Sequence, residues 1–474
     1  MQVSGRAHPV TILVYLGRVF FLIIIPVVRG FVSALSGGFV GWISGAWADI
    51  LVVLTMLSIA VIAWLYSVYQ IDGEKIHFRY GLLLRRHKVI PLKNITVFSV
   101  KRMFFLRPLR AVKLSADTLG GGARHPDFTI LLHEKKAEPI AKHIWRLDDE
   151  PPEKSYKPST VLIVVLSLLT SGSFAGVVLI ATFISQAGSI LGRQFSNMMI
   201  GTFEEVSRAF AFGLPPAAAA TAYILLAGWF VSAALSFIKY KNLTLTRQGQ
   251  RLLVSGGMLT TRKYYVRYAD INFIDMRQSI VTRLLKLKNL YLSATGYGKQ
   301  KDDISYIIPS GREPSFSLTC ENLFPKLIPV PRSYPPGATG IMRFLGQPIF
   351  SILCIAAALI IFPMLFPSWK SFILFTGLMA FIPALFFLFT RIADYSTGGL
   401  GFSGENYVLR YSIGFTLHTA IIPADKVVSV ELRQSFFQKF GRYCDLVIRT
   451  KSEGRAVHRC RSMIKADMQR FFAM

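Results

Sequence analysis

The chain has 474 residues and carries 54 Lys and Arg against 26 Asp and Glu, a formal net charge of +28. Its residues are 52% hydrophobic and 17% charged, which excludes both one ordinary soluble domain and a chain buried entirely in a membrane. Because long apolar blocks accompany the positive charge, an anionic membrane surface is a better expected partner than nucleic acid.

Six apolar blocks are candidate membrane-spanning helices, since a bilayer core of about 30 Å needs roughly 20 helical residues. The first, residues 10–31, contains Arg18 and Arg29. Two placements stay open: both arginines reach the membrane surfaces, or Arg29 lies deep in the membrane. No signal-peptide cleavage site follows this block, so we expect it to be retained. The other five blocks are Ile50–Tyr66, Thr160–Ile184, Pro215–Phe237, Phe344–Phe366 and Phe372–Phe389.

The blocks come in three pairs, and a long polar segment follows each pair. Residues 69–159, 239–343 and 391–474 hold 18, 17 and 13 Lys and Arg, whereas the links within the pairs hold very few. Positive residues stay on the cytoplasmic side of a membrane. The sequence therefore predicts three hairpins of spans, with both termini and all three polar segments in the cytoplasm.

The three polar segments are copies of one β-rich module. Each opens with a short strand and a turn, continues as an alternating strand, and returns after a second tight turn. The phrases "IPLKNITVFSV", "VRYADINFIDM" and "IPADKVVSVEL" then bring Ile95, Ile271 and Val427 into register. They precede "KRMFFLRPLR", "RQSIVTRLLK" and "RQSFFQKFGR", and the strands "AVKLSAD", "NLYLSAT" and "DLVIRTK".

At least two modules are expected to close with a helix. "AEPIAKHIW" places Ile140, Ile144 and Trp145 on one helical face, while the middle module's "CENLFPKL" is a weaker match. Several twisted strands and a capping helix predict a small open barrel whose end the helix plugs. In "IKADMQRFF" the expected apolar face consists of Ile464, Met468, Phe471 and Phe472.

The predicted fold class is therefore an α+β membrane protein with six transmembrane helices in three hairpins. Each hairpin is followed by a cytoplasmic β-barrel module with a C-terminal helix. The predicted hairpins are residues 10–68, 160–238 and 343–391, and the predicted modules are residues 69–150, 239–330 and 392–474.

This order of paired spans, β-rich module, "IP" phrase, Arg-Gln-Ser and basic turn resembles the bacterial pleckstrin-homology (PH) domain membrane proteins. It is most similar to the larger, YdbT-like members, with three modules on three hairpins, and covers nearly the whole chain. The resemblance implies a PH-like fold for each module, a bacterial inner-membrane location and no established catalytic residues. It also implies a smaller, single-module PH-like membrane protein as a partner. The first module departs from the pattern with Lys101-Arg102-Met103.

Basic residues at two places in the modules are the candidate binding residues for anionic lipid headgroups or for a partner protein. On PH-like folds a basic first hairpin can meet headgroups; general positive-inside charge is the alternative. Arg-Gln-Ser could equally stabilise the repeated turn. The first-hairpin candidates are Arg85, Arg86, Lys88, Arg262, Lys263 and Arg267, and those of the repeated phrase are Lys101, Arg102, Arg277, Gln278, Arg433 and Gln434.

The sequence contains no motif that points to catalysis or to a cofactor. Its eight histidines show no HExxH spacing, its four cysteines form no CxxC pair, and no nucleotide-binding loop or nucleophile elbow occurs. We therefore expect no enzyme, no catalytic residue, no metal and no cofactor. Nucleic acid is not expected either, because the cations are spread over three tethered modules without a base-stacking motif.

Two functions remain in view for such a chain. The first is a non-enzymatic scaffold whose tandem modules contact proteins or anionic lipids of the inner leaflet, in envelope stress or antimicrobial resistance. The second is a component of a transporter or channel with PH-like regulatory domains. A transport path usually needs charged residues at midplane depth, and apart from the arginines of the first block the spans carry none, which favours the scaffold.

Overall fold

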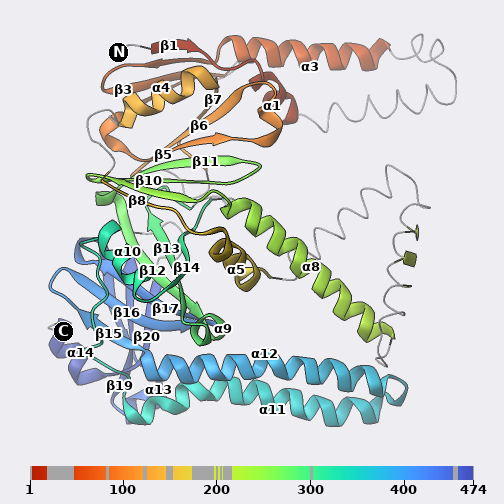
Figure 1. Ribbon diagram of the computed structural model, residues 1–474, viewed down its shortest axis with the longest axis vertical. Helices are drawn as coiled ribbons and strands as arrows, with labels where there is room; N and C mark the ends of the chain where they lie inside the picture. Colours follow the sequence, from red (N-terminus) through yellow and green to blue (C-terminus); the bar gives the residue numbers. More distant parts are fainter. Residues whose placement is uncertain are drawn as a thin grey trace. The chain divides into compact units, whose positions relative to one another are not determined.

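The computed structural model in Figure 1 describes residues 3–18, 47–81, 85–120, 125–145, 153–172, 197–198, 201–202, 205, 216–298, 303–451 and 457–472. Arg29 and the second half of the block Thr160–Ile184 lie outside the described residues. The chain divides into two compact units. The first contains residues 1–152, 248–253 and 259–267, and the second contains residues 153–247, 254–258 and 268–474.

The described parts of the apolar blocks are helical. Three segments are long and apolar enough to cross a membrane: Tyr223–Tyr240, Ala338–Leu365 and Pro367–Thr397. Two of these contain α11 and α12, which lie side by side in Figure 1. Six spans therefore stay a prediction. The helices are α1 (Thr11–Arg18) and α3 (Trp47–Leu65) in the first unit, and α5 (Thr160–Thr170), α8 (Pro216–Tyr240), α11 (Ile341–Leu365) and α12 (Lys370–Thr397) in the second.

Polar side chains join these helices because hydrogen bonds cannot be left unmade in an apolar environment. The Trp64 indole at the end of α3 donates to the Ala7 carbonyl at 2.7 Å, just before α1. The Trp229 indole of α8 donates to the Leu168 carbonyl of α5 at 3.1 Å. At the far end of α12, Arg391 donates to the Ser412 hydroxyl at 2.6 Å and thereby joins that helix to the third module.

The first unit contains two antiparallel sheets around one core. The sheet β1-β2-β3-β4 includes a strand, β1, that pairs with β2 and was not predicted. The second sheet includes the strands β7-β6-β5-β11, and α4 (Glu134–Trp145) buries Ile140, Ile144 and Trp145 as predicted. The strands are β1 (Val3–Arg6), β2 (Val68–Ile71), β3 (Lys75–Tyr80), β4 (Arg86–Pro91), β5 (Ile95–Arg102), β6 (Ala111–Thr118), β7 (Phe128–His133) and β11 (Thr261–Arg267).

The second unit contains a six-stranded sheet, β14-β13-β12-β17-β16-β15, and a three-stranded sheet, β18-β19-β20. A short strand, β8 (Lys154–Tyr156), pairs with β9 (Thr244–Gln248), which β10 (Arg251–Gly256) follows in the chain. The others are β12 (Ile271–Ser279), β13 (Leu287–Ala294), β14 (Tyr306–Arg312), β15 (Gly399–Phe402), β16 (Asn406–Ile413), β17 (Thr416–Pro423), β18 (Val427–Arg433), β19 (Tyr443–Thr450) and β20 (Val457–Ile464).

A helix closes all three modules, including the middle one, where the sequence signal was weak. The helices α10 (Ser315–Leu323) and α14 (Lys465–Phe472) close the second and third modules. One expectation is wrong: Ile464 belongs to β20 and is 39% exposed, so the helical face starts later than predicted. Met468 is fully buried in the third module's core, and Phe471 and Phe472 pack against that core.

The sequence predicts a separate small barrel for each module, and this expectation is wrong. Strands of neighbouring modules pair with each other, so no module forms all of its sheets alone. Strand β11 of the second module pairs with β5 of the first, with Arg262 opposite Lys101. Strand β17 of the third module pairs with β12 of the second, with His418 opposite Arg277. Each pairing joins the third strand of one module to the fourth strand of the module before it, so sheets continue from module to module.

Candidate membrane-facing site

Each module contains a turn at the junction of its fourth and fifth strands. These module turns are the aligned residues 103–110, 279–286 and 435–442, which are the last eight residues of each repeated phrase. In the second and third modules the turn holds a short helix, α9 (Ile280–Leu284) or α13 (Phe436–Phe440). In the first it holds a 3-10 turn at Phe104–Leu106.

Arg-Gln-Ser stands at the start of the module turn, and its serine and glutamine stabilise that turn. Ser279 and Ser435 cap α9 and α13, each in a capping box with the residue three positions later. The Gln278 side-chain amide donates to the Leu287 carbonyl at 2.8 Å, and Gln434 donates to the Tyr443 carbonyl at 2.8 Å. These two amides therefore stabilise the turn, which was one of the two roles left open by the sequence.

The arginine of the phrase is held by an acidic residue two positions earlier on the same strand. Arg277 Nε lies 2.7 Å from Asp275 Oδ2, and Arg433 Nε lies 2.7 Å from Glu431 Oε1. The Arg277 guanidinium also stacks on the Tyr291 ring at 3.6 Å. The guanidinium of Arg277 is thus committed to the fold, whereas Arg433 remains exposed on β18.

Large apolar side chains project from all three module turns into solvent. Exposure of at least 60% is far above what a buried core residue shows, and clustered apolar exposure marks a surface that meets a membrane or a partner. The residues with this exposure are Phe104, Phe105, Leu284, Phe436 and Phe440.

A cation in the left-handed region of backbone space ends each module turn. Arg110, Lys286 and Arg442 have φ angles of 49°, 55° and 56°, an uncommon conformation for residues other than glycine. The carbonyls of Arg110 and Arg442 accept hydrogen bonds from Glu134 N and Lys465 N, at the start of the closing helices. The backbone conformation thus serves the fold, while all three cationic side chains are exposed. Sequence reasoning missed these residues, although the aligned phrases all end in a cation.

The module turns lie against the ends of the apolar helices. In the second unit, Ser279, Ile280 and Val281 line a cavity of about 370 Å³ together with side chains of α5, α8 and α12. Arg343 of α11 donates to the Ser435 hydroxyl at 3.3 Å. In the first unit, Leu106 packs in a small cluster with Val10, which directly precedes α1. Each of the three turns therefore lies beside at least one apolar helix or the residue that precedes it.

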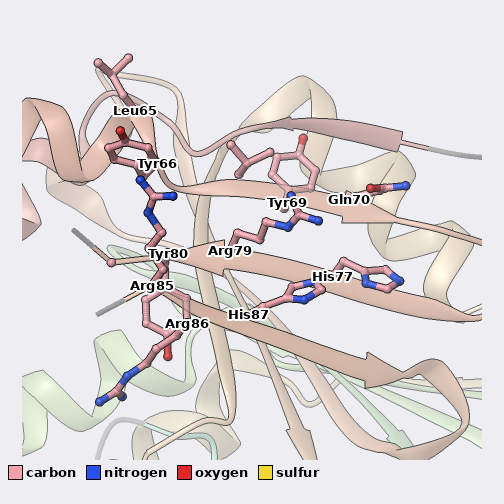
Figure 2. Close-up of a pocket in the computed structure, with 12 residues that line it drawn as sticks. Leu65, Tyr66, Tyr69, Gln70, His77, Arg79, Tyr80, Arg85, Arg86 and His87 are labelled. Atoms are coloured by element: carbon pink, nitrogen blue, oxygen red, sulfur yellow. The ribbon is translucent and has the colours of Figure 1, made fainter. Parts of the chain in front are cut away.

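A basic pocket of about 380 Å³ lies in the first unit, where the chain leaves α3 (Figure 2). Leu65 and Tyr66 line it from the end of α3, and His77 and Arg79 line it from β3. Arg85, Arg86 and His87 line it from the start of β4, and none of the described lining residues is acidic. Two of the three cations predicted on this hairpin thus meet in one pocket.

Aromatic rings organise the pocket's cations. The Arg85 guanidinium carbon lies 5.1 Å from the centre of the Tyr66 ring, which Figure 2 shows beside it. The His77 and His87 imidazoles stack with centroids 5.6 Å apart. Sequence reasoning missed Arg79 and Tyr66. The outward-facing alternation of His77 and Arg79 on β3 was the signal that could have found Arg79.

The other predicted cations are engaged elsewhere in the fold. Lys88 donates to the Asp127 carbonyl at 2.6 Å, and Arg267 donates to the Lys93 carbonyl at 2.8 Å. Lys101 is buried, with its ammonium 5.4 Å from the Tyr264 ring. The remaining contacts are those of Arg102 with Glu134, Lys263 with Glu138, and Arg262 with the Thr260 carbonyl. These residues do not converge on the basic pocket.

Replacing Ser435 with alanine is expected to loosen the third module turn by about 1 kcal/mol, the usual cost of losing an N-terminal helix cap. The backbone N–H of Gln438 would lose its acceptor, the Ser435 hydroxyl oxygen, which lies 3.4 Å from it. Hydrogen–deuterium exchange of α13 amides should therefore accelerate roughly fivefold. Ser429→Ala, on an exposed position of β18, is the control. Unchanged exchange in Ser435→Ala would show that the capping box does not hold the turn.

Comparisons with known proteins identify relatives along most of the chain. A family model described as "Bacterial PH domain" matches residues 13–147, 200–320 and 348–471. The chain is also 21% identical to the "UPF0699 transmembrane protein YdbT" of Bacillus subtilis (strain 168), over 95% of this chain and 94% of the relative. No solved structure matches the chain.

Proposed function

The chain belongs to the bacterial PH domain family as a membrane protein with three such modules, and from that premise we propose that it is a non-enzymatic membrane scaffold whose module turns and basic pocket contact anionic lipid headgroups. One observation carries the proposal. In all three modules, exposed apolar side chains and exposed cations share one turn, and that turn lies by an apolar helix.

The chemistry of the module turns fits the boundary between headgroups and acyl chains. A phenylalanine such as Phe440 gains roughly 1.5–3 kcal/mol when its side chain leaves water completely. Each Lys or Arg near an anionic leaflet adds about 1 kcal/mol. Three weak contacts on one chain act together because each raises the effective concentration of the next. A modest affinity at each turn therefore suffices to hold the modules at the leaflet.

The basic pocket is the place for one defined headgroup in this proposal. Tyr66 ends the apolar helix α3, and tyrosines favour the membrane interface. Arg79, Arg85 and Arg86 are exposed around the pocket and can present several donors to one phosphate. A phosphate at headgroup depth would meet these donors without leaving the membrane surface.

The proposal includes the topology expected from the sequence. Six spans in three hairpins would place both termini and all three modules on the cytoplasmic face of a bacterial inner membrane, as the distribution of cations supports. The module boundaries 69–150, 239–330 and 392–474 belong to the same proposal. A smaller, single-module PH-like membrane protein is the proposed heterologous partner.

Removing the two pocket arginines is expected to weaken selection of anionic lipid. In the full chain reconstituted with mixed phosphatidylglycerol and phosphatidylcholine, Arg85→Ala/Arg86→Ala should lose about 2 kcal/mol of that preference, roughly thirtyfold for a bound headgroup. Mass spectrometry of the lipid retained by the purified protein measures the change. Lys135→Ala/Lys136→Ala removes two exposed cations from α4 and is the matched control. Equal phosphatidylglycerol retention by both variants would remove the headgroup pocket from the proposal.

A further inference from the structure

The two pairings between modules have the same register, residue for residue. In the repeat alignment, Lys101 corresponds to Arg277, and Arg262 corresponds to His418. Arg262 lies opposite Lys101 in the first pairing, and His418 lies opposite Arg277 in the second. Three residues further along, Tyr265 lies opposite Phe98 and Ile421 lies opposite Ile274. Six residues pair in each case. The third strand of one module and the fourth strand of another thus form a repeated, defined interface.

The fourth strand of the third module, β18, has this interface, and no strand among the described residues pairs with it there. It forms one edge of the sheet β18-β19-β20, whereas β5 and β12 have a neighbour on both sides. The corresponding strands differ in burial: Thr96 of β5 is fully buried and Asn272 of β12 is 1% exposed. Val428, at the same repeat position of β18, is 59% exposed. Edge strands of this kind are templates for a further strand.

The third strand of the first module, β4, is the matching edge. It ends the sheet β1-β2-β3-β4 and has only β3 beside it among the described strands. Its first four residues are all exposed. Its repeat counterparts are β11 and β17, which each fill the interface of the preceding module. One chain therefore carries both halves of the repeated interface, and in the part of the chain that the structure describes neither half has a strand paired with it.

We propose that β18 of one copy of this protein pairs with β4 of a second copy, in the register of the two internal pairings. Arg433 then lies opposite Arg86, Leu432 opposite His87, and Val430 opposite Val89. The partner is a second copy because the repeat supplies β4 at the same position in its module as β11 and β17, with six residues, the number that pair in each internal contact. This self-assembly goes beyond the proposed lipid contacts and does not require them.

The charges at this register have precedents within the chain. In the pairing of β12 with β17, Asp275 binds Arg277 on its own strand and His418 Nδ1 across the interface at 2.7 Å. Glu431 takes the place of Asp275 and already binds Arg433. Arg86 takes the place of His418, and the Glu431 carboxylate, which also lies 3.7 Å from Arg449 Nη2, is 43% exposed and can accept from Arg86 as well. Two cations also lie opposite each other at this position where Lys101 meets Arg262.

The resulting contact is head-to-tail and joins two different surfaces. Such heterologous contacts extend into rings or open chains instead of closing as two-fold dimers. Each added copy presents its own free β18 or β4 to the next. The strand pairing that joins modules inside one chain would thus also join one chain to the next along the membrane.

Disulfide cross-linking between differently tagged full-length copies in the same membranes tests the pairing. One copy carries Leu432→Cys and the other carries His87→Cys, and Cys354→Ala removes the exposed native thiol from every version. The intrachain standard is Val100→Cys/Lys263→Cys, at the same repeat position of the internal pairing. An adjacent-residue control combines Leu432→Cys with Lys88→Cys, whose side chain points to the other face of β4.

The cysteines at Leu432 and His87 are expected to cross-link the two tagged copies. Their cross-linking yield should be within about threefold of that of the intrachain standard and at least about tenfold above that of the adjacent-residue control. Glu431→Lys should lower that yield about tenfold, and Arg86→Glu on the other copy should restore it. Membranes of neutral lipid give the same result, which separates this proposal from headgroup binding. Absent cross-linking beside a positive standard would overturn it and leave β18 to a different protein. Equal yields from both cysteine pairs would also overturn it.

Discussion

Replacing Asp275 with alanine is expected to lower the free energy of opening the sheet between the second and third modules by about 3–5 kcal/mol. Asp275 is fully buried on β12 and accepts from Arg277 Nε and His418 Nδ1, both at 2.7 Å. Removing the carboxylate leaves the Arg277 guanidinium, whose side chain is only 17% exposed, without its counter-ion. Such a loss exceeds the cost of most single substitutions.

Hydrogen–deuterium exchange of β12 and β17 amides measures this loss in the full chain. A change of 3–5 kcal/mol corresponds to exchange about a hundredfold faster or more. Asp275→Asn keeps the shape and one acceptor and should fall between alanine and the native protein. Asp425→Ala removes a carboxylate that is 70% exposed and pairs with Lys426, so it is the control. If Asp275→Ala and Asp425→Ala exchange alike, the buried network does not hold the two modules together.

The same network gives a defined pH dependence. Burial alone raises the pKa of Asp275, but His418 and Arg277 more than offset it and lower that pKa from 3.8 to about 2. A carboxylate whose pKa falls on folding stabilises the folded state above its ordinary pKa. This contribution is therefore lost as pH falls from about 4 to about 2, and the loss should be absent in Asp275→Asn.

Asp445→Ala is expected to release α11 from the third module, at a cost of about 3–5 kcal/mol. The buried Asp445 carboxylate binds Arg343 of α11 at 3.0 Å and Gln438 of the module turn at 2.7 Å. It also accepts from Arg459 and, at 3.0 Å, from the backbone of Ser462. Desolvation raises the pKa of Asp445, and these donors lower it below its ordinary value.

The second module supplies the matched substitution. Asn289 occupies the position of Asp445 and accepts from Ser310 N at 2.7 Å, as Asp445 accepts from Ser462 N. Asp445→Asn should therefore preserve the strand contact and lose only the charged contacts, at roughly 1.5–3 kcal/mol. Exchange at the start of α11 and in α13 separates the two variants. Exchange in Asp445→Asn equal to that of the unsubstituted protein would show that the charged contact with Arg343 contributes nothing beyond the hydrogen bond to Ser462.

The order of strands within each module was predictable, because alternation and turn residues are local properties of the sequence. The pairing of β5 with β11 was not, because alternation says which side chains face a core and nothing about which distant strand lies alongside. The alternation in "ITVFSVKR" does not reveal that Ser99 and Lys101 of β5 are buried where β11 of the neighbouring module pairs with β5. A short polar strand such as β1 gave no signal at all.

The candidate site was predictable only where its residues are neighbours in the sequence. Arg85 and Arg86 adjoin in sequence and do meet in the basic pocket. Tyr66 and Arg79 reach it from a helix end and another strand, so only the fold brings them there. Lys101 and Arg277 were predicted as binding residues because they are cations in a repeated phrase. The structure engages them in the fold through Tyr264 and Asp275.

Because strands of different modules share a sheet, paired strands are synthesised at widely separated times. Strand β5 leaves the ribosome complete at Arg102, but its neighbour β11 begins only at Thr261. At about 5–20 residues per second, the edge of β5 waits on the order of ten seconds for its neighbour. Strand β12 waits similarly for β17. Apolar blocks of the second and third hairpins emerge during these intervals. Delayed membrane insertion should therefore favour mispaired edges, and truncation after residue 150 should leave β5 permanently open to aggregation.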